Sequence, residues 1–364
     1  MNNNNLNIDF KSFPTTRYQG SKRKILPWIH EVVKDLKFHT VLDACGGSAS
    51  VSYLFKKIGK SVTYNDKLHF NYQIGKAIIE NRKERLLKDD ITNLQKTNTN
   101  ILYDNFIQTT FKDVYYLPHE NRWLDKVVNN IVNMNHYQPD ILEYKKALSF
   151  YAVFQASLIK RPFNLFHRKN LNIRTADVKR NFGNKATWEV PFKDYLLKFA
   201  TEANDLVFDS GNECKALNKS ILELDPYGYD LVYIDPPYIR KEGNNESSNY
   251  FNCYHFLEGL SNYENWNNLI DYDTNNLKLK NWKDQDDFSK DKIKETFENI
   301  LYIFSKNKIV LSYKKGGFPS IEFIKKTMQK MGKTVYTKSR HYQYALNHQN
   351  GDSKNNREVL IIGI

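Results

Sequence analysis

Cysteine is scarce in this sequence, with three residues among 364, at positions 45, 214 and 253. Their odd number and wide spacing fit neither a disulfide framework nor a zinc site of paired cysteines, which indicates a reducing compartment. No apolar run approaches the roughly 18 residues that a membrane-spanning helix needs. The opening stretch MNNNNLNIDF lacks the basic and apolar regions of a signal peptide. We therefore expect a cytoplasmic protein with no membrane partner and no metal.

Acidic residues are also in short supply. Lys and Arg number 54 against 41 Asp and Glu, so the net charge is +13 and the isoelectric point is about 9.3. This excess favours a polyanionic partner, nucleic acid first and an anionic membrane surface second. The alternative is a basic surface that is simply solvated. With 40% apolar and 14% aromatic residues, the chain can bury a substantial core.

The hydrophobic pattern alternates between strands and helices at both ends of the chain. TVLD at 40–43 predicts a strand, SASVSYLFKKIG at 48–59 a helix, and SVTYND at 61–66 a second strand. Such a βαβ unit implies a parallel sheet. Later runs predict strands at 231–235 and 308–313, and an antiparallel pair at 333–339 and 357–363. The expected fold class is α/β, a Rossmann-like and mostly parallel sheet with an antiparallel closing hairpin.

The middle of the chain lacks this alternation of strand and helix patterns. Between residues 157 and 198 there are ten Lys or Arg but three Asp or Glu, and residues 161–192 lack a helical period. We expect a catalytic domain in two parts, 1–85 and 205–364, around an inserted DNA target-recognition region at 86–204. Residues 240–290, polar and aromatic, predict a long mobile excursion.

The loop DACGGSAS at 43–50 follows the first strand. Gly46 and Gly47 allow a tight turn and a close approach to a ligand at the start of the next helix. Asp66 ends the second strand, where such folds place an acid against ribose hydroxyls. A purely structural turn explains the glycines equally well.

The stretch DLVYIDPPY at 230–238 ends a buried strand in a carboxylate. The prolines fix the backbone and remove N–H groups, so the Asp235 carboxylate and the Pro236 carbonyl are neighbouring acceptors. Two such acceptors suit a group with two N–H donors, and the Tyr238 ring can stack on the flat face attached to it. An exocyclic nucleobase amine fits this description. The alternative is a capped turn in which nearby N–H groups satisfy Asp235.

Four motifs in this order, YQGSK at 18–22, DACGGSAS, Asp66 and DPPY at 235–238, resemble the Dam-like, alpha-class adenine DNA methyltransferases. LSY at 311–313 and the ending NREVLII resemble the later strands of that family. The resemblance covers roughly residues 15–80 and 205–364. Two positions depart from the family pattern, because Cys45 stands where the family usually has Phe and Ala49 where it has Gly.

The resemblance implies S-adenosylmethionine as cofactor and a role for each motif. Tyr18 and Lys22 would contact the cofactor, with Lys22 near its carboxylate or near the target base. Asp43, Gly46 and Gly47 would cradle the methionine part, and Asp66 the ribose. Asp235 would contact the target amine and lie near the cofactor, and Tyr238 would stack on the extruded adenine. Asp209 is a candidate for the acid that lines the cofactor adenine.

These expectations converge on a site-specific DNA adenine-N6 methyltransferase acting on a flipped-out base of double-stranded DNA. A restriction–modification system with a cognate restriction endonuclease is the expected setting. Methylation of cytosine N4 and a non-catalytic nucleic-acid binder on the same fold are the alternatives. Basic and amide side chains of the middle segment predict DNA contacts, and they are Arg161, Asn164, Arg168, Arg174, Lys179, Arg180, Asn184 and Lys185.

Overall fold

The computed structural model describes residues 8–178, 185–242, 249–280, 287–342 and 356–364. The chain divides into two compact units. A sheet unit comprises residues 1–67, 210–250 and 283–364, and a helical unit comprises 68–209 and 251–282. The predicted boundaries at 85 and 204 differ from this division, since 68–85 and 251–282 belong to the helical unit. The predicted Lys179, Arg180 and Asn184 lie outside the described residues.

The sheet unit contains seven strands in the order β3-β2-β1-β4-β5-β7-β6. Strand β7 pairs antiparallel with both β5 and β6, and the remaining neighbours pair in parallel, which confirms the mostly parallel sheet with its closing hairpin. The strands are β1 Thr40–Asp43, β2 Ser61–Asn65, β3 Cys214–Leu217, β4 Leu231–Ile234, β5 Lys308–Lys314, β6 Val335–His341 and β7 Arg357–Gly363. Strand β3 has only four residues, of which Lys215 is exposed, and the sequence pattern did not reveal it.

The connections of this sheet reverse direction between β1 and β4. The chain runs outward from β1 through β2 to β3 and then returns to β4 on the other side of β1. Asp43 pairs in register with Tyr233, two residues before Asp235. Ligands of open α/β sheets bind at the carboxyl ends of the strands at such a reversal, so the topology brings the glycine loop and DPPY to one place.

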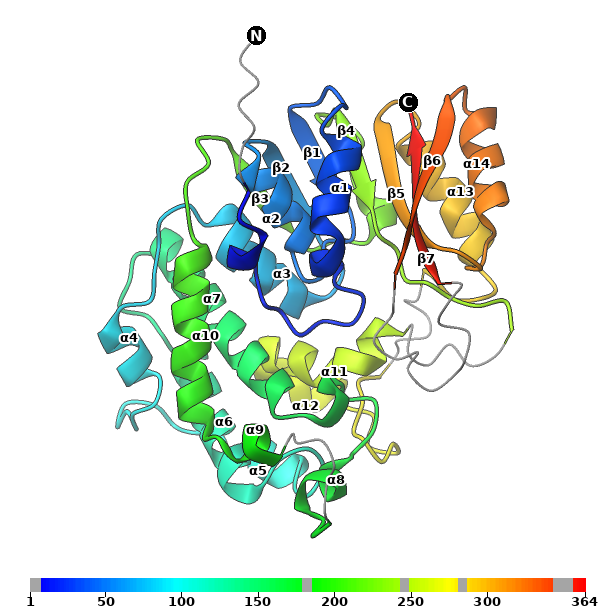
Figure 1. Cartoon of the computed structure of the whole chain (residues 1–364). Helices are drawn as coiled ribbons and strands as arrows, with labels where there is room; N and C mark the ends of the chain where they lie inside the picture. Colours follow the sequence, from blue (N-terminus) through cyan, green and yellow to red (C-terminus); the bar gives the residue numbers. More distant parts are fainter. Residues whose placement is uncertain (1–7, 179–184, 243–248, 281–286, 343–355) are drawn as a thin grey trace. The chain divides into compact units, whose positions relative to one another are not determined.

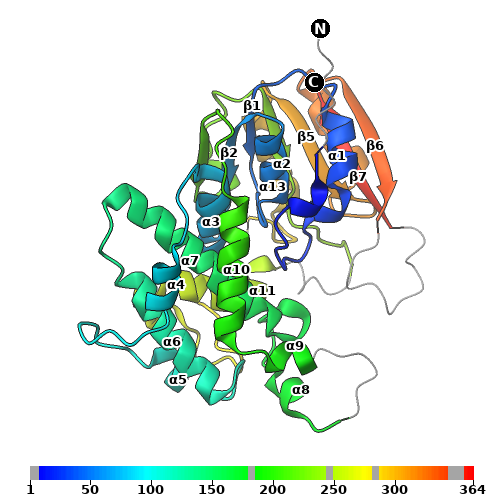
Figure 2. The ribbon, with the colours of Figure 1, turned by 60° about the vertical axis from the view of Figure 1, so that its left-hand side comes forward.

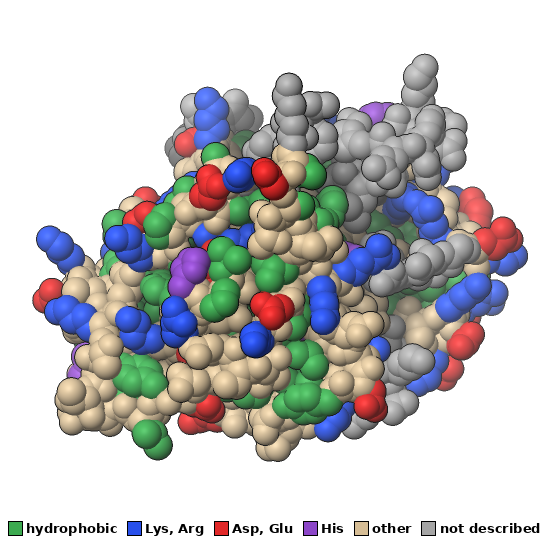
Figure 3. Space-filling model, turned by 90° about the horizontal axis from the view of Figure 1, so that it is seen from below, with side chains coloured by type: hydrophobic (Ala, Val, Ile, Leu, Met, Phe, Trp, Pro, Cys, Tyr) green, Lys and Arg blue, Asp and Glu red, His purple; other side chains and the backbone are tan. Residues whose placement is uncertain are grey.

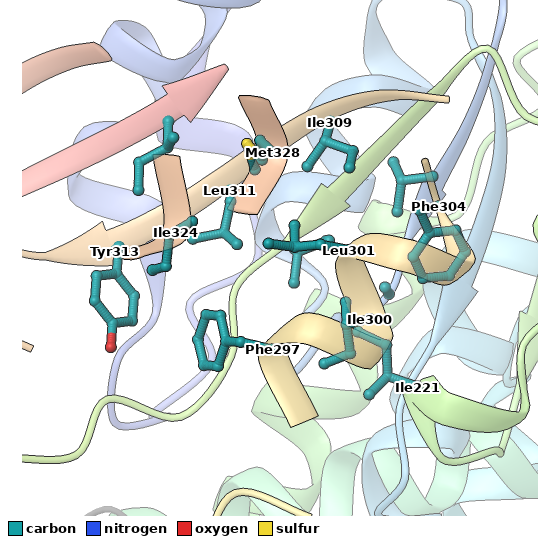
Figure 4. Packing of buried hydrophobic residues seen from close by; sticks show 14 of the residues in the cluster. Ile221, Phe297, Ile300, Leu301, Phe304, Ile309, Leu311, Tyr313, Ile324 and Met328 are labelled. Carbon is teal, nitrogen blue, oxygen red and sulfur yellow. The ribbon is translucent and has the colours of Figure 1, made fainter. Parts of the chain in front are cut away.

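Helices cover both faces of this sheet (Figure 1). Alternate strand side chains point to opposite faces. Leu311 of β5 packs with Phe297 and Ile324 of two helices on one face (Figure 4), while Tyr233 of β4 meets Phe55 of α2 at a ring-centroid distance of 6.1 Å on the other. The helices of the unit are η1 Phe10–Ser12, η2 Lys22–Ile25, α1 Leu26–Val33, α2 Ser50–Lys57, η5 Ile221–Glu223, α13 Ile293–Ile303 and α14 Ile321–Lys330.

In the helical unit the described residues form no regular strand, and the long helices α7 and α10 pack along each other (Figure 2). Its elements are α3 His69–Gly75, η3 Lys76–Glu80, α4 Lys88–Asn93, α5 Phe106–Thr110, α6 Pro118–Val132, α7 Pro139–Ile159, η4 Pro162–Asn164, α8 Leu171–Thr175, α9 Lys185–Glu189, α10 Phe192–Leu206, α11 Tyr250–Ser261, η7 Tyr263–Asn265 and α12 Trp266–Leu269.

The described part of 240–290 is not the loose excursion that its polar composition predicts. Helix α11 runs through it, and Trp266 is fully buried among Phe111, Phe256 and other rings at centroid distances of 4.8 and 5.0 Å. Gly259 makes room for this indole, because a Cβ there would lie 1.9 Å from it. Aromatic packing, with more than 150 Å² buried per ring, outweighs the polar residues between the rings.

Candidate active site

The glycine loop after β1 is held by hydrogen bonds at both of its glycines. The Gly46 N–H donates to the Asn65 carbonyl, and the Gly47 N–H donates to Asp66 Oδ2, both at 2.8 Å. A Cβ at Gly46 would lie 2.2 Å from the Tyr64 ring, and Gly47 has a φ of 48°. Packing and backbone conformation therefore account for both glycines, and the argument for a ligand rests on the side chains around them.

Ala49 explains why the family prefers glycine at this position. Its φ is 60°, and it directly precedes Ser50, the first residue of α2. The left-handed conformation costs an L-residue roughly 1–2 kcal/mol, whereas glycine adopts it freely. Alanine at this position therefore adds strain to the turn.

Carboxylates gather at this end of the sheet. Burial, and then the charges of Asp66, Asp235, Asp43 and Asp287, raise the pKa of the Cys45 thiol well above its ordinary value. A protein with a net charge of +13 thus has a locally acidic site here. Such a site favours a small ligand that carries positive charge.

Asp43 and Asp66 occupy the ends of β1 and β2. Asp43 is 1% exposed, and its Oδ2 accepts a 2.6 Å hydrogen bond from Ser52 Oγ in the first turn of α2. Burial, opposed by that bond and reinforced by nearby carboxylates, raises the pKa of Asp43 to about 7. Asp66, which is also buried, fixes the loop through Gly47.

The amino-terminal segment YQGSK lies against the glycine loop. A Cβ at Gly47 would be 3.0 Å from the Tyr18 ring. The hydroxyl of Ser21 lies 3.1 Å from that of Ser48 and 3.3 Å from that of Ser50, and the latter two are 2.9 Å apart. Three small hydroxyls therefore join the two motifs, which are separated by more than twenty residues in sequence.

Lys22 and Asp235 form a buried ion pair at the centre of the site. Lys22 Nζ lies 2.6 Å from Asp235 Oδ2 and donates to the Gly20 carbonyl at 3.1 Å, with 5% of the lysine side chain exposed. Burial alone would lower the pKa of Lys22, but Asp235 and Glu358 raise it well above its ordinary value. Burial, opposed by Lys22 and reinforced by Glu358, raises the pKa of Asp235. The lysine therefore stays charged.

The Tyr238 hydroxyl reaches two carboxylates. It lies 2.7 Å from Asp235 Oδ1 and 2.6 Å from Glu358 Oε1. Glu358 also accepts from Ser312 Oγ at 2.7 Å and lies 3.6 Å from Lys22 Nζ. Each carboxylate offers about four lone-pair sites, so Asp235 keeps acceptor capacity beyond Lys22 and Tyr238. Among the described residues, nothing donates to the Pro236 carbonyl.

Glu358 and Ser312 are the residues of this cluster that sequence reasoning missed. Glu358 has no exposed surface and stands in β7, where the next residues are Val-Leu-Ile-Ile. Ser312 is likewise buried inside the apolar strand β5. The sequence did contain a signal for Glu358, which is a charged residue beside an apolar run that predicts a buried strand. Buried carboxylates are rare unless they are paired, so such a residue indicates a buried partner.

Two of the predicted DNA contacts, Arg161 and Arg174, have side chains that bind other residues of the protein itself. Arg161 is 1% exposed and donates to the carbonyls of Leu165, Arg168 and Lys169 at 2.7–3.1 Å. The Arg174 guanidinium forms a two-pronged ion pair with Glu120 at 2.8 Å, and both side chains are 4% exposed. Long basic side chains also satisfy buried acceptors, and composition does not distinguish the two uses.

The other predicted DNA contacts that the structure describes lie nearer the surface. Arg168 is exposed, and so is Lys185, which lies 3.9 Å from Glu189. Asn164 is half-buried, with a left-handed φ of 57°. Figure 3 shows one face of the molecule, on which Lys and Arg side chains are spread among acidic ones.

The predicted Asp209 belongs to the helical unit, where it pairs with Arg82 at 2.8 Å, and 54% of its side chain is exposed. In the sheet unit, Asp287 is one of the carboxylates that raise the pKa of Cys45, and it accepts from Ser220 Oγ at 2.9 Å and pairs with Lys67 at 2.7 Å.

Within the described ranges, no cluster of three or more His, Cys, Asp or Glu has the arrangement of a metal site. Across the same residues, no helix combines the length and the apolar character that crossing a bilayer requires.

Comparisons with known proteins identify the family of this chain. A model of the D12 class N6 adenine-specific DNA methyltransferase family matches residues 18–327. Type II methyltransferase M2.HphI of Haemophilus parahaemolyticus is 30% identical over 262 residues, covering 69% of this chain and 72% of that protein. Type II methyltransferase M.FokI of Planomicrobium okeanokoites is 24% identical over 281 residues, covering 68% of this chain and 37% of that protein.

The family match includes YQGSK, the glycine loop and DPPY, which the fold brings to the carboxyl ends of neighbouring strands. The chain therefore belongs to the D12 class of N6 adenine-specific DNA methyltransferases.

Proposed function

We propose that this DNA adenine methyltransferase uses S-adenosylmethionine and activates the target amine with Asp235 and the Pro236 carbonyl. The observation that carries the proposal is the partly buried Asp235 carboxylate at the sheet's reversal point, which lies 2.6 Å from Lys22 Nζ. An adenine amine is a poor nucleophile because its lone pair is delocalised into the ring. Two acceptors that draw its hydrogens out of the ring plane localise that pair.

The residues around the glycine loop fit this cofactor. When bound, S-adenosylmethionine supplies an electrophilic methyl group on a positively charged sulfonium. The carboxylates that act on Cys45 suit that charge. Asp66 would hold the ribose hydroxyls, Asp43, Gly46 and Gly47 the methionine part, and Tyr18 and Lys22 would line the same pocket.

Two physical effects account for the rate. Holding the amine in attack geometry contributes up to about 7–11 kcal/mol in well-oriented systems. Negative charge on Asp235 stabilises the positive charge that develops on the nitrogen. Because the pKa of Asp235 is raised, its carboxylate is also suited to hold the proton that the amine loses.

The target base must leave the duplex to reach this site. Extrusion costs a few kcal/mol, and stacking on Tyr238 offsets part of it, since a base on an aromatic ring gains roughly 1–3 kcal/mol. Lys22 Nζ lies 5.0 Å from the centre of the Tyr238 ring, close enough for a cation–π contact.

Recognition of the DNA sequence is assigned to the helical unit. Arg168, Lys185 and Asn164 are the described candidates for contacts to phosphates and base edges, and Lys179, Arg180 and Asn184 remain candidates from the sequence. The two relatives are named Type II methyltransferases. We therefore assign this protein to a restriction–modification system with a cognate endonuclease that need not bind it.

Mass spectrometry of DNA incubated with the protein and S-adenosylmethionine tests the proposal. N6-methyladenine is the expected product, and N4-methylcytosine would contradict the assignment of the base. Asp235→Ala is expected to abolish transfer and to leave DNA affinity within about threefold. Loss of binding together with transfer would make Asp235 a structural residue instead.

A further inference from the structure

Glu358 stands opposite the acceptor Asp235 across the Tyr238 hydroxyl. Both carboxylates are within hydrogen-bond distance of this hydroxyl, at 2.6 Å for Glu358 and 2.7 Å for Asp235. A phenol has one hydrogen, so it donates to only one carboxylate at a time. Glu358 Oε1 also accepts from Ser312 Oγ at 2.7 Å, so Asp235 Oδ1 is the oxygen that needs another donor when the phenol turns away from it.

The target amine is a source of that hydrogen at Asp235. When an amine N–H occupies Asp235 Oδ1, the phenol hydrogen can rotate to Glu358 Oε1 without movement of the ring. Without Glu358, the acceptors left to the phenol are Asp235 Oδ1, which the amine also uses, and the more distant Ser312 Oγ at 3.3 Å. The phenol would then exchange a charged acceptor for a neutral and longer contact, which weakens its hydrogen bond.

Strand β7 places the Glu358 side chain among neighbours that fix its position. Its side chain has no exposed surface and is fixed by Ser312 Oγ at 2.7 Å. Lys22 Nζ, 3.6 Å away, is shared between Glu358 and Asp235. Its carboxylate is therefore held in place before a substrate arrives.

Resting on the proposed role of Asp235, we propose that Glu358 is a positioning residue for methyl transfer, accepting the Tyr238 hydroxyl when the target amine binds Asp235. It touches neither the base nor the cofactor. Its effect passes through the phenol and through Lys22.

Single-turnover methylation with saturating S-adenosylmethionine tests this role. The substrate is an unmethylated duplex that contains the target sequence, identified beforehand by sequencing DNA that the protein has methylated. Glu358→Ala is expected to lower the rate roughly 10- to 100-fold, the size expected for a lost hydrogen bond to a charged group. Glu358→Gln keeps an acceptor and is expected to recover most of that rate. Arg357→Gln, an exposed neighbour on β7, is the matched control and should not change it.

The Tyr238→Phe background separates positioning from a general structural role. Phenylalanine has no hydroxyl to place, so Glu358→Ala should change the rate less than about threefold there, against 10- to 100-fold in the wild-type background. Equal losses from Glu358→Ala in the two backgrounds would overturn the proposal. Fluorescence of 2-aminopurine at the target position should show undiminished extrusion in Glu358→Gln.

The pH profile gives an independent readout. Glu358 is one of the groups that raise the pKa of Asp235, so Glu358→Gln should move the acid limb of the rate to lower pH. An unmoved limb would contradict the coupling. Asp235→Ala distinguishes failure of this inference from failure of the proposed function. Methyl transfer by Asp235→Ala would refute the proposed function. Normal rates for both Glu358 variants, with an inactive Asp235→Ala, would refute only the role of Glu358.

Discussion

Replacing Lys22 with methionine tests the electrostatics on which the site depends. The substitution keeps much of the side-chain volume and removes the cation that lies 2.6 Å from Asp235 and 3.6 Å from Glu358. Removing one partner of a buried ion pair costs about 3–5 kcal/mol, because the other charge stays desolvated and unpaired. Here two carboxylates lose their partner, so we expect the upper part of that range at pH 8.

Hydrogen exchange of amides in β4, β5 and β7 measures this cost locally. At about 1.4 kcal/mol per tenfold change, a loss of this size corresponds to amide exchange that is faster by roughly 10³-fold or more, up to the limit set by global unfolding. Lys34→Met is the control, since its pair with Glu31 at 2.5 Å is largely exposed and should leave exchange unchanged.

Acidification should reduce the difference between Lys22→Met and wild type. The pKa of Asp235 is already raised and rises further without the lysine, so a proton replaces the lost charge as the pH falls. Wild-type exchange in Lys22→Met at pH 8, or a difference that does not change with pH, would refute the buried ion pair as a source of stability.

The remaining predictions concern other buried and exposed charges. Between pH 4 and about 7, the free energy of unfolding of Asp43→Asn should rise relative to that of wild type by roughly 1.4 kcal/mol per pH unit. The reason is that the native Asp43 carboxyl keeps a proton that the unfolded chain has lost, so only the wild type loses stability as the pH rises. Plots of unfolding free energy against pH that run parallel for the two proteins would contradict the raised pKa. Arg161→Ala should lower the melting temperature, because it removes the donors to three backbone carbonyls. An unchanged melting temperature would contradict a structural role for Arg161. Replacing Arg168 and Lys185 with Gln should weaken DNA binding and flatten its salt dependence; unchanged slopes would place the phosphate contacts elsewhere.

Much of the sheet unit followed from local pattern. The four residues of β1, the antiparallel pairing of β6 with β7 and the family's order of motifs were all predicted, because buried strands read as apolar runs between turns. The carboxylates at the ends of β1, β2 and β4 were also predictable, since polar residues that follow apolar strands mark the ligand edge of such sheets.

Only the tertiary structure decided which charged side chains serve the fold. Arg161 and Arg174 have the composition of DNA contacts, but their partners are carbonyls and a glutamate that folding brings to them. Glu358, more than a hundred residues from Asp235 in sequence, meets the Tyr238 hydroxyl because β7 pairs beside β5. Local sequence determines where a strand ends and which groups stand there. Whether a charge faces solvent, substrate or another buried charge depends on packing between distant segments, which no local pattern contains.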